Sequence, residues 1–349
     1  MIGWAQFFEA LVKVVVIFVF LLVVVLLLVW AERKIVAAMQ NRYGPTRAGP
    51  FGILQTLADG LKLLVKEPVT PRKVELALYL AAPFFALIPA LLIFLVIPIG
   101  ASVSIGDSSY SLQGTDLNIG LLYILAMSSI AVYAVTLAGW SSGSKYPLLG
   151  SVRASAQMIS YEAAMGLALV PVVMFAGTTS IAGIVEAQAG GFGGLLPAWN
   201  IVLLPSFVIF VIAAFAETNR APFDLVEAEN EIVGGYHTEY SGFRFAMFFL
   251  AEYINVFNMS AITVTLFLGG WNGPVFGPGW LETLLPLVWF LLKTFLIVFL
   301  FIWVRATLPR FRYDQLMALG WKRLIPVSLV WIILAMVAIG VRRFGLPWT

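Results

Sequence analysis

The densest group of ionisable residues in this sequence lies between residues 216 and 244, where six acidic side chains accompany two arginines. Pro222 suits the first turn of a helix, in which Asp224, Glu227 and Glu231 fall at i, i+3 and i+7 on one face. Carboxylates this close repel one another, so some must bind protons or cations, or recruit partners, near neutral pH. A solvated acidic face is the alternative, but apolar residues among the acids argue against it. The candidates for proton transfer are Glu217, Asp224, Glu227, Glu229 and Glu231.

Three further ionisable residues, Glu162, Glu252 and Lys293, fall inside long apolar stretches. Because a helix rises about 1.5 Å per residue, each glutamate lies about 13 Å along its helix from the preceding basic residue. Lys293 lies about 18 Å from Arg305, near the middle of a bilayer core about 30 Å thick. A charge there costs about 2.5–3.5 kcal/mol and needs a partner or a hydrated cavity. Each of the three therefore belongs either to a buried structural ion pair or to a proton or ion path.

The elements that hold these residues are predicted to be membrane-spanning helices. Of the 349 residues, 61% are hydrophobic and 11% are charged, whereas a soluble domain needs about 25% charged residues. The apolar stretches are long enough to cross the bilayer as helices. We predict an all-α polytopic membrane bundle that forms a single membrane domain over residues 1–349. The eight expected spans are 14–31, 77–101, 119–140, 156–177, 200–216, 245–270, 284–304 and 324–341.

The basic residues indicate the orientation of the bundle. Alternate loops hold most of the lysines and arginines, namely 31–76, 140–155, 217–244 and 305–323. The intervening loops 102–118, 178–199 and 271–283 hold none. By the positive-inside bias the basic loops face the cytoplasm, and both termini lie on the outer side.

One basic loop contains an amphipathic segment at residues 51–66. Leu54, Leu57, Leu61 and Leu64 recur at helical spacing, while Asp59 and two lysines fall on another face. The segment is too short to span the membrane, so we expect a helix that lies along the membrane surface.

The composition also excludes several kinds of site. The absence of cysteine removes disulfides, iron–sulfur ligation and zinc-thiolate sites, and a single histidine, His237, makes a histidine-rich metal or haem site implausible. No basic run is interleaved with aromatic residues, so nucleic acid is not an expected partner. We expect no metal and no cofactor bound by this chain alone, and any redox chemistry nearby must use cofactors carried by other subunits.

Four blocks of the sequence resemble one membrane subunit of bacterial NADH:quinone oxidoreductase (respiratory complex I), the one that adjoins the hydrophilic arm and the quinone site. The first contains Ala31-Glu32-Arg33-Lys34 and Asn41-Arg42-Tyr43-Gly44-Pro45 and continues to Pro68. The others are Arg153–Glu162, the acidic segment with Ala251-Glu252-Tyr253 after it, and Arg305–Met317. The resemblance covers most of the chain, and the outer loops and last span match in hydropathy only.

The resemblance implies roles for particular residues. In the family, the first span, the surface helix and the sixth span frame a tunnel for the quinone tail, so Glu32, Arg33, Arg42 and Asp59 are expected to line or gate its entrance. We expect Asp59 and Arg42 to hold this entrance in shape by charge pairing near the bilayer surface. A family route of carboxylates from the quinone chamber into the membrane matches Glu217, Asp224, Glu227, Glu229 and Glu231 of the acidic segment, with Glu162 and Glu252 deeper. Arg305, Arg310 and Arg312 are expected to dock another subunit of the complex. The single histidine departs from the family pattern and receives no role.

The resemblance also implies partners and a location. Quinone is the expected substrate, while NADH, flavin and iron–sulfur centres belong to partner subunits. Those partners are peripheral-arm quinone-site subunits, small membrane subunits and antiporter-like subunits, together with membrane lipid. The expected location is the bacterial cell inner membrane, which the chain crosses several times. Quinone reduction is expected to perturb the coupled titration of the carboxylates and so drive proton translocation.

Two alternatives remain open. A related membrane subunit anchors energy-converting hydrogenases or dehydrogenases with other electron donors, although the complete first block favours a quinone user. A stand-alone cation/proton transporter would also use Glu162, Glu252 and Lys293. That transporter requires inverted repeats with broken helices, which this sequence does not display.

Overall fold

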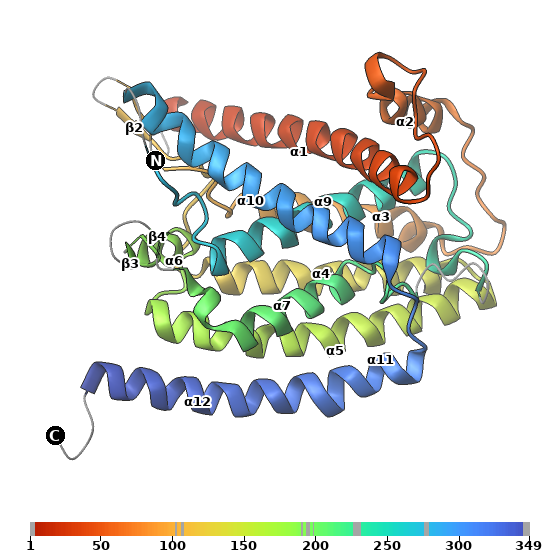
Figure 1. Ribbon diagram of the computed structural model, residues 1–349. Helices are drawn as coiled ribbons and strands as arrows, with labels where there is room; N and C mark the ends of the chain where they lie inside the picture. The colour runs from red at the N-terminus through yellow and green to blue at the C-terminus, as the bar shows by residue number, and fades with distance from the viewer. Residues whose placement is uncertain are drawn as a thin grey trace.

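The computed structural model is a bundle of long helices (Figure 1). It describes residues 4–101, 103–105, 108–189, 191–192, 196–197, 199–225, 232–275 and 279–344. Over these residues, seven helical segments are long and apolar enough to cross a membrane, and α7 is a shorter apolar helix of 14 residues. The prediction of an all-α polytopic bundle is confirmed. The helices of the bundle are α1 (Trp4–Met39), α3 (Leu76–Phe94), α4 (Gly120–Ser141), α5 (Lys145–Ala176), the shorter α7 (Leu204–Glu217), α9 (Phe243–Phe267), α10 (Gly279–Thr307) and α12 (Ile325–Phe344).

Shorter elements connect the long helices. Strand β1 (Val103–Ile105) pairs antiparallel with β2 (Ser108–Tyr110), and β3 (Gly191–Phe192) pairs antiparallel with β4 (Leu196–Pro197). A π-helical turn, η4 (Gly320–Leu324), joins α11 to α12, so that the last span runs from Tyr313 to Val341. The remaining short helices are η1 (Pro50–Gly52), α2 (Gln55–Val65), α6 (Ile181–Ala187), η2 (Asn200–Val202), η3 (Gly235–His237) and α11 (Tyr313–Leu319).

The helix ends differ from the ends of the apolar stretches. We expected the first span to stop at residue 31, but α1 continues to Met39 because charged residues do not break a helix. It ends before Asn41, whose φ of 53° lies in the left-handed region that asparagine tolerates. In contrast, α3 ends at Phe94 although its apolar stretch runs to 101, because the chain tightens into a turn in which Ile97 N donates to Phe94 O at 3.1 Å.

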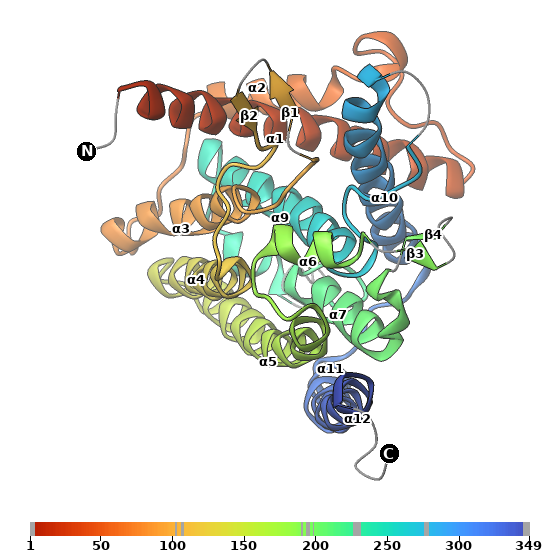
Figure 2. The same ribbon diagram turned by 90° about the vertical axis from the view of Figure 1, so that its left-hand side faces the viewer.

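Helix α9 forms the centre of the bundle. Figure 2 shows α9 between α3, α7 and α10, with α1 and α12 on opposite edges. Within its most apolar window α9 is 67% buried, whereas the window of the last span is 17% buried. Phe257 of α9 packs against Phe94 of α3 with ring centres 5.7 Å apart. Most of the large apolar side chains of α12 are therefore exposed on the surface of this chain.

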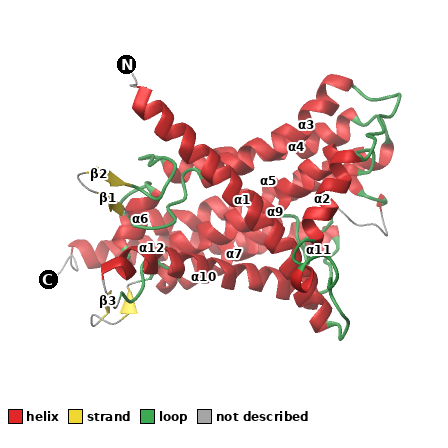
Figure 3. Cartoon of the chain, turned by 90° about the horizontal axis from the view of Figure 1, so that it is seen from above, coloured by secondary structure: helices red, strands yellow, loops and turns green. Residues whose placement is uncertain are grey.

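The two ends of the bundle carry different elements. Figures 1 and 3 place α2 and α11 at one end, and α6, the strands, the start of α1 and the end of α12 at the other. On α2, Leu57, Leu61 and Leu64 are 43–56% exposed, whereas Asp59 turns towards α1. The apolar face of α2 thus points away from the protein, as expected of a helix lying on a membrane surface.

Candidate functional site

A cavity of about 660 Å³ opens between α1, α2, α9 and α10 at the end of the bundle that carries α2. Its wall combines charged groups from α1 with the apolar and aromatic side chains of α9, which suits a ligand with a polar head and an apolar body. Glu32 and Arg33 line it directly, and Arg42 lines it from the loop after α1. The remaining lining residues are Val36, Gln40, Tyr43, Gly44, Pro45, Gln55, Phe249, Tyr253, Arg305 and Ala306.

Asp59 lies beside this cavity and fastens α2 to α1. Its carboxylate accepts a hydrogen bond of 2.7 Å from Arg33, accepts another of 3.3 Å from Gln55, and lies 3.6 Å from Lys62. Partial burial acts to raise the pKa of Asp59, but the hydrogen bond and charge of Arg33 outweigh it and hold the pKa below its usual range. We expected Asp59 to pair with Arg42. That expectation was wrong, because Arg42 donates instead to Gln40 at 2.7 Å.

Behind the cavity lies a buried cluster of charges from four elements. Glu32 accepts a hydrogen bond from Arg305 of α10 and lies 3.5 Å from Arg220, which follows α7. The Nε atom of Arg220 lies 2.8 Å from Oε1 of Glu252 on α9. The same guanidinium stacks over the ring of Tyr253 at 4.3 Å. Arg220 therefore joins a carboxylate of the cavity wall to one inside the bundle.

Arg220 is 6% exposed, yet it stays charged. Burial acts to lower its pKa, but the charges of Glu252 and Glu32 outweigh that effect and raise the pKa above its usual value. The turn that presents it is held by Gln157 of α5, whose amide donates to the carbonyl oxygens of Ala216 and Phe223, both at 2.8 Å. These contacts fix the loop, so the arginine position is set by α5 as well as by its partners.

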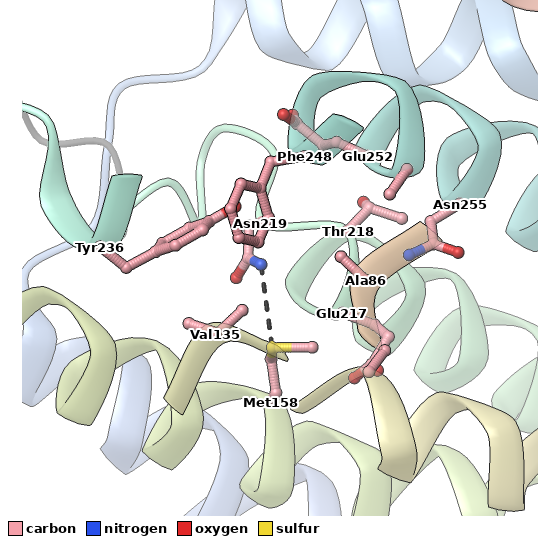
Figure 4. Close-up of a pocket in the computed structure, with 12 residues that line it drawn as sticks. Ala86, Val135, Met158, Glu217, Thr218, Asn219, Tyr236, Phe248, Glu252 and Asn255 are labelled. Atoms are coloured by element: carbon pink, nitrogen blue, oxygen red, sulfur yellow. Dashed lines mark hydrogen bonds between the residues drawn. The ribbon is translucent and has the colours of Figure 1, made fainter. Parts of the chain in front are cut away.

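A second, small cavity of about 40 Å³ lies next to this cluster. Figure 4 shows Glu217, Asn219, Glu252 and Asn255 around it, with Asn219 reaching Met158 at 3.8 Å. A polar space of this size holds a water molecule. Glu217 and Glu252 both line this cavity, so it adjoins a carboxylate from α7 and one from α9.

Beyond the small cavity, α4 contacts two glutamates. Ser128 Oγ donates to Glu217 Oε1 at 2.6 Å, and Ser129 Oγ donates to Glu162 on α5. Glu217 is 6% exposed, so the hydrogen bond from Ser128 takes the place of one that water would donate to an exposed carboxylate. Glu162, Glu217 and Glu252, which the sequence singled out separately, are thus neighbours in one polar group. This group is the polar line, and it consists of Glu32, Arg220, Glu252, Glu217, Gln157, Ser128, Ser129 and Glu162.

Other candidates lie elsewhere. Asp224 accepts a hydrogen bond of 3.0 Å from Arg310, and Arg312 pairs with Asp314 at 3.2 Å on the exposed surface. Arg305, expected at a docking surface, lies instead in the cavity wall. Residues 221–225 form a turn rather than the helix expected at Pro222. Glu227, Glu229 and Glu231 lie outside the described residues.

Within the described residues, Lys293 bonds backbone carbonyl groups and no acidic side chain. Its Nζ atom donates to the carbonyl oxygens of Leu268, Gly270 and Asn272 at 2.8, 3.0 and 2.6 Å. It also lies 4.9 Å from the centre of the Trp199 ring. All three ammonium hydrogens are used, so Lys293 caps the end of α9. Of the two roles considered for this residue, the geometry differs from a buried ion pair, and the role in a proton or ion path stays a prediction.

Four residues of the polar line were missed from the sequence: Arg220, Gln157, Ser128 and Ser129. Arg220 lies among six acids in the sequence, but its partners Glu32 and Glu252 lie outside that segment, so the local pattern does not reveal them. The serines carry no signal in the sequence, because a hydroxyl in a helix usually bonds its own backbone. His237, which received no role, packs among Tyr236 and Phe245, and its burial lowers its pKa to about 4.

Comparison with known proteins identifies relatives over nearly the whole chain. The family model described as NADH dehydrogenase matches residues 12–336, a range that includes every site residue discussed above. An NADH-quinone oxidoreductase subunit from Frankia alni is 53% identical over 337 residues, which cover 95% of this chain and 73% of that protein. An NADH-quinone oxidoreductase subunit from Koribacter versatilis is 52% identical over 335 residues, or 92% of this chain and 94% of that protein.

Proposed function

Since this chain belongs to the NADH dehydrogenase family and is a membrane subunit of an NADH-quinone oxidoreductase, we propose that it forms the entrance by which quinone leaves the bilayer. We further propose that it couples quinone reduction to proton translocation through a series of carboxylates. The cavity between α1, α2, α9 and α10 is the proposed entrance. The proposed carboxylate series runs from Glu32 through Glu252 and Glu217 to Glu162.

The shape and lining of the cavity support the entrance. A quinone has a polar head and a long apolar tail, so its path must begin at the hydrocarbon and end among polar groups. Helix α2 offers exposed leucines towards the membrane, and the pair formed by Arg33 and Asp59 holds α2 against α1. A lipid-soluble ligand can therefore slide beneath α2 and reach Glu32 and Arg305 without crossing bulk water.

The single observation that carries the coupling proposal is the position of Arg220 between Glu32 and Glu252. When quinone is reduced near Glu32, negative charge and a demand for protons arise there. That charge competes with Glu32 and Glu252 for the same guanidinium, because an arginine in a buried site interacts strongly with every nearby carboxylate. A change at the cavity therefore alters the proton affinity of Glu252 and, across the small cavity, of Glu217.

The same proposal includes the redox centres and the membrane orientation. This chain has no cysteine for iron–sulfur ligation, so NADH, flavin and iron–sulfur centres belong to peripheral-arm subunits. We place the basic end, with α2, Arg310 and Arg312, on the cytoplasmic side of a bacterial inner membrane, where it docks the peripheral arm. Small membrane subunits and antiporter-like subunits then adjoin the bundle within the membrane.

The test uses the assembled enzyme in proteoliposomes. Glu252→Gln preserves size and hydrogen bonding but removes both charge and titration. We expect NADH oxidation by artificial acceptors to remain near normal, because that step uses the peripheral arm, while quinone reduction and proton translocation fall together by about 10-fold or more. Glu282→Gln, at an exposed glutamate near the opposite end of α10, is the matched control. Full coupled activity in Glu252→Gln, Glu162→Gln and the double variant would refute the carboxylate series.

A further inference from the structure

Two consecutive residues of α4, Ser128 and Ser129, each donate a hydrogen bond to a glutamate from a different helix. The partner of Ser128 is Glu217, the last residue of α7, and the partner of Ser129 is Glu162 in the middle of α5. Most serines in membrane helices bond only their own backbone. Ser260 of α9 does so, since its hydroxyl donates to Val256 O at 2.8 Å.

Ser129 has two acceptors within reach of its single hydroxyl hydrogen. Besides Glu162, the carbonyl oxygen of Leu125 lies 3.0 Å from Ser129 Oγ. A hydroxyl group has one hydrogen and two lone pairs, so it can donate to only one of these groups at a time while it accepts from the other. The carbonyl of Leu125 cannot donate, whereas a protonated Glu162 can. A protonated Glu162 can therefore donate to Ser129 Oγ while the serine hydrogen turns to Leu125 O, whereas an ionised Glu162 can only accept.

Ser128 differs from Ser129 in this respect. Within the described residues, the hydroxyl of Ser128 bonds only Glu217, at 2.6 Å, and both side chains are buried. If Glu217 takes a proton and donates it to the serine, the hydroxyl hydrogen of Ser128 loses its acceptor. An unpaired donor in a buried site is unfavourable. Of the two serines, Ser129 is therefore the one with a second acceptor, Leu125 O, for its hydroxyl hydrogen.

We propose that Ser129 is a positioning residue for proton translocation, whose hydroxyl reverses its hydrogen bond so that Glu162 can take up and release a proton. This inference rests on the proposed carboxylate series. When Glu162 binds a proton, its O–H donates to Ser129 Oγ and the serine hydrogen turns to Leu125 O. When the proton leaves, the serine hydrogen returns to the carboxylate. The serine neither gains nor loses a proton in the cycle.

The test compares Ser129→Ala, Ser129→Thr and the control Ser260→Ala in the assembled enzyme in proteoliposomes. For Ser129→Ala we expect about a 10-fold lower maximal rate of quinone reduction and of proton translocation. The KM for quinone should not change, because Ser129 does not line the large cavity. The pH dependence of the rate should also differ from that of the wild type, since the charge-assisted hydrogen bond from Ser129 to the carboxylate is lost.

Ser129→Thr keeps the hydroxyl, so its rate and pH dependence should match those of the wild type. If the serine only filled space, the hydroxyl of Ser129→Thr would have no such effect. Ser260→Ala removes a hydroxyl that bonds backbone only and should resemble the wild type. If Ser129→Ala does not assemble, Ser129→Cys provides the test. Its S–H group is a weak donor, so the rate of quinone reduction should be lower and its pH dependence should differ from that of the wild type.

The outcomes separate this inference from the proposed function. Suppose that Glu162→Gln is impaired but Ser129→Ala, or Ser129→Cys where that variant is used, has the rate and pH dependence of the wild type. This result overturns the role of Ser129 and leaves the carboxylate series intact. Wild-type behaviour of both Ser129→Ala and Glu162→Gln overturns both. Loss of rate in Ser129→Thr equal to that in Ser129→Ala also overturns the inference, because the hydroxyl is then not what matters.

Discussion

The guanidinium of Arg220 is held against Glu252, with 2.8 Å between Nε and Oε1, in a part of the bundle from which water is largely excluded. A buried charge is tolerated when its partners and its stacking surface replace the lost solvent. Arg220 obtains those contacts from Glu32 and Tyr253 as well as from Glu252. Because these partners belong to α1 and α9, a single side chain ties the cavity wall to the core helix.

Arg220 should therefore tolerate no substitution without loss of quinone reduction. Arg220→Lys keeps the charge, but one ammonium cannot bridge two carboxylates and stack on Tyr253 together. We expect an assembled enzyme with about 10-fold slower quinone reduction. Arg220→Gln leaves two buried carboxylates without their cation, at a cost of about 3–5 kcal/mol, and should assemble poorly. The measurements are subunit content and quinone reduction in purified membranes. Arg72→Lys, at an exposed position, is the control, and an equal loss in both lysine variants would contradict the bridging role.

The pair formed by Arg33 and Asp59 should affect quinone binding more than assembly. Its side chains are 43% and 27% exposed, so solvent screens the pair and limits its contribution to about 1 kcal/mol or less. Asp59→Ala should raise the KM for quinone by about 2–5-fold, because α2 is then held less firmly beside the cavity. Lys62→Ala is the control, since Lys62 is more exposed and lies 3.6 Å from Asp59. Unchanged quinone kinetics in a fully assembled Asp59→Ala enzyme would remove α2 from the proposed entrance.

The sequence predicts the helical architecture well because lipid demands long apolar stretches, which hydropathy detects directly. It also predicts the surface helix and most of the carboxylates. It does not predict their partners. Glu32 and Arg220 are 188 residues apart, and no local pattern records that α1 and the end of α7 meet. The pairing of Asp59 with Arg33 was missed for a similar reason. Arg33 and Arg42 are equally plausible partners until the C-terminal end of α1 and the path of the loop after it are known.

The predicted helix boundaries differ from the observed ones for a different reason. Hydropathy marks where the membrane ends, whereas a helix ends where its backbone hydrogen bonds end. Helix α1 therefore carries Glu32 and Arg33 beyond the apolar stretch, and this extension brings them to the cavity. The partners of Lys293 are backbone carbonyls, which every residue possesses, so the sequence gives no sign of them.

His237 should make the stability of the assembled protein depend on pH. Burial lowers its pKa from 6.5 to about 4, against the opposing charge of Asp224. Between about pH 6.5 and 4, His237 is therefore neutral in the folded protein but protonated in the unfolded chain. The contribution of His237 to the free energy of unfolding is complete above pH 6.5 and falls as the pH drops through this range. Between pH 7.5 and 5.5 the loss should be about 1 kcal/mol. His237→Gln should lose less stability over the same interval in thermal unfolding of the purified enzyme, and equal losses would show that the histidine titrates normally.

Lys293 should prove structural, although it is a buried cation within a membrane helix. Its three hydrogens are committed to carbonyl oxygens from residues 268–272, and Trp199 covers its remaining side. Lys293→Met keeps the length of the side chain but leaves those carbonyls without their donor, which should destabilise the protein by more than about 2 kcal/mol. We therefore expect less assembled enzyme, with an unchanged ratio of protons translocated to quinone reduced in what does assemble. Lys322→Met, at an exposed lysine, is the control and should change neither quantity. The measurements are subunit content and the ratio of protons translocated to quinone reduced in proteoliposomes. A lower ratio in assembled Lys293→Met enzyme would contradict the structural role and indicate that Lys293 takes part in proton translocation.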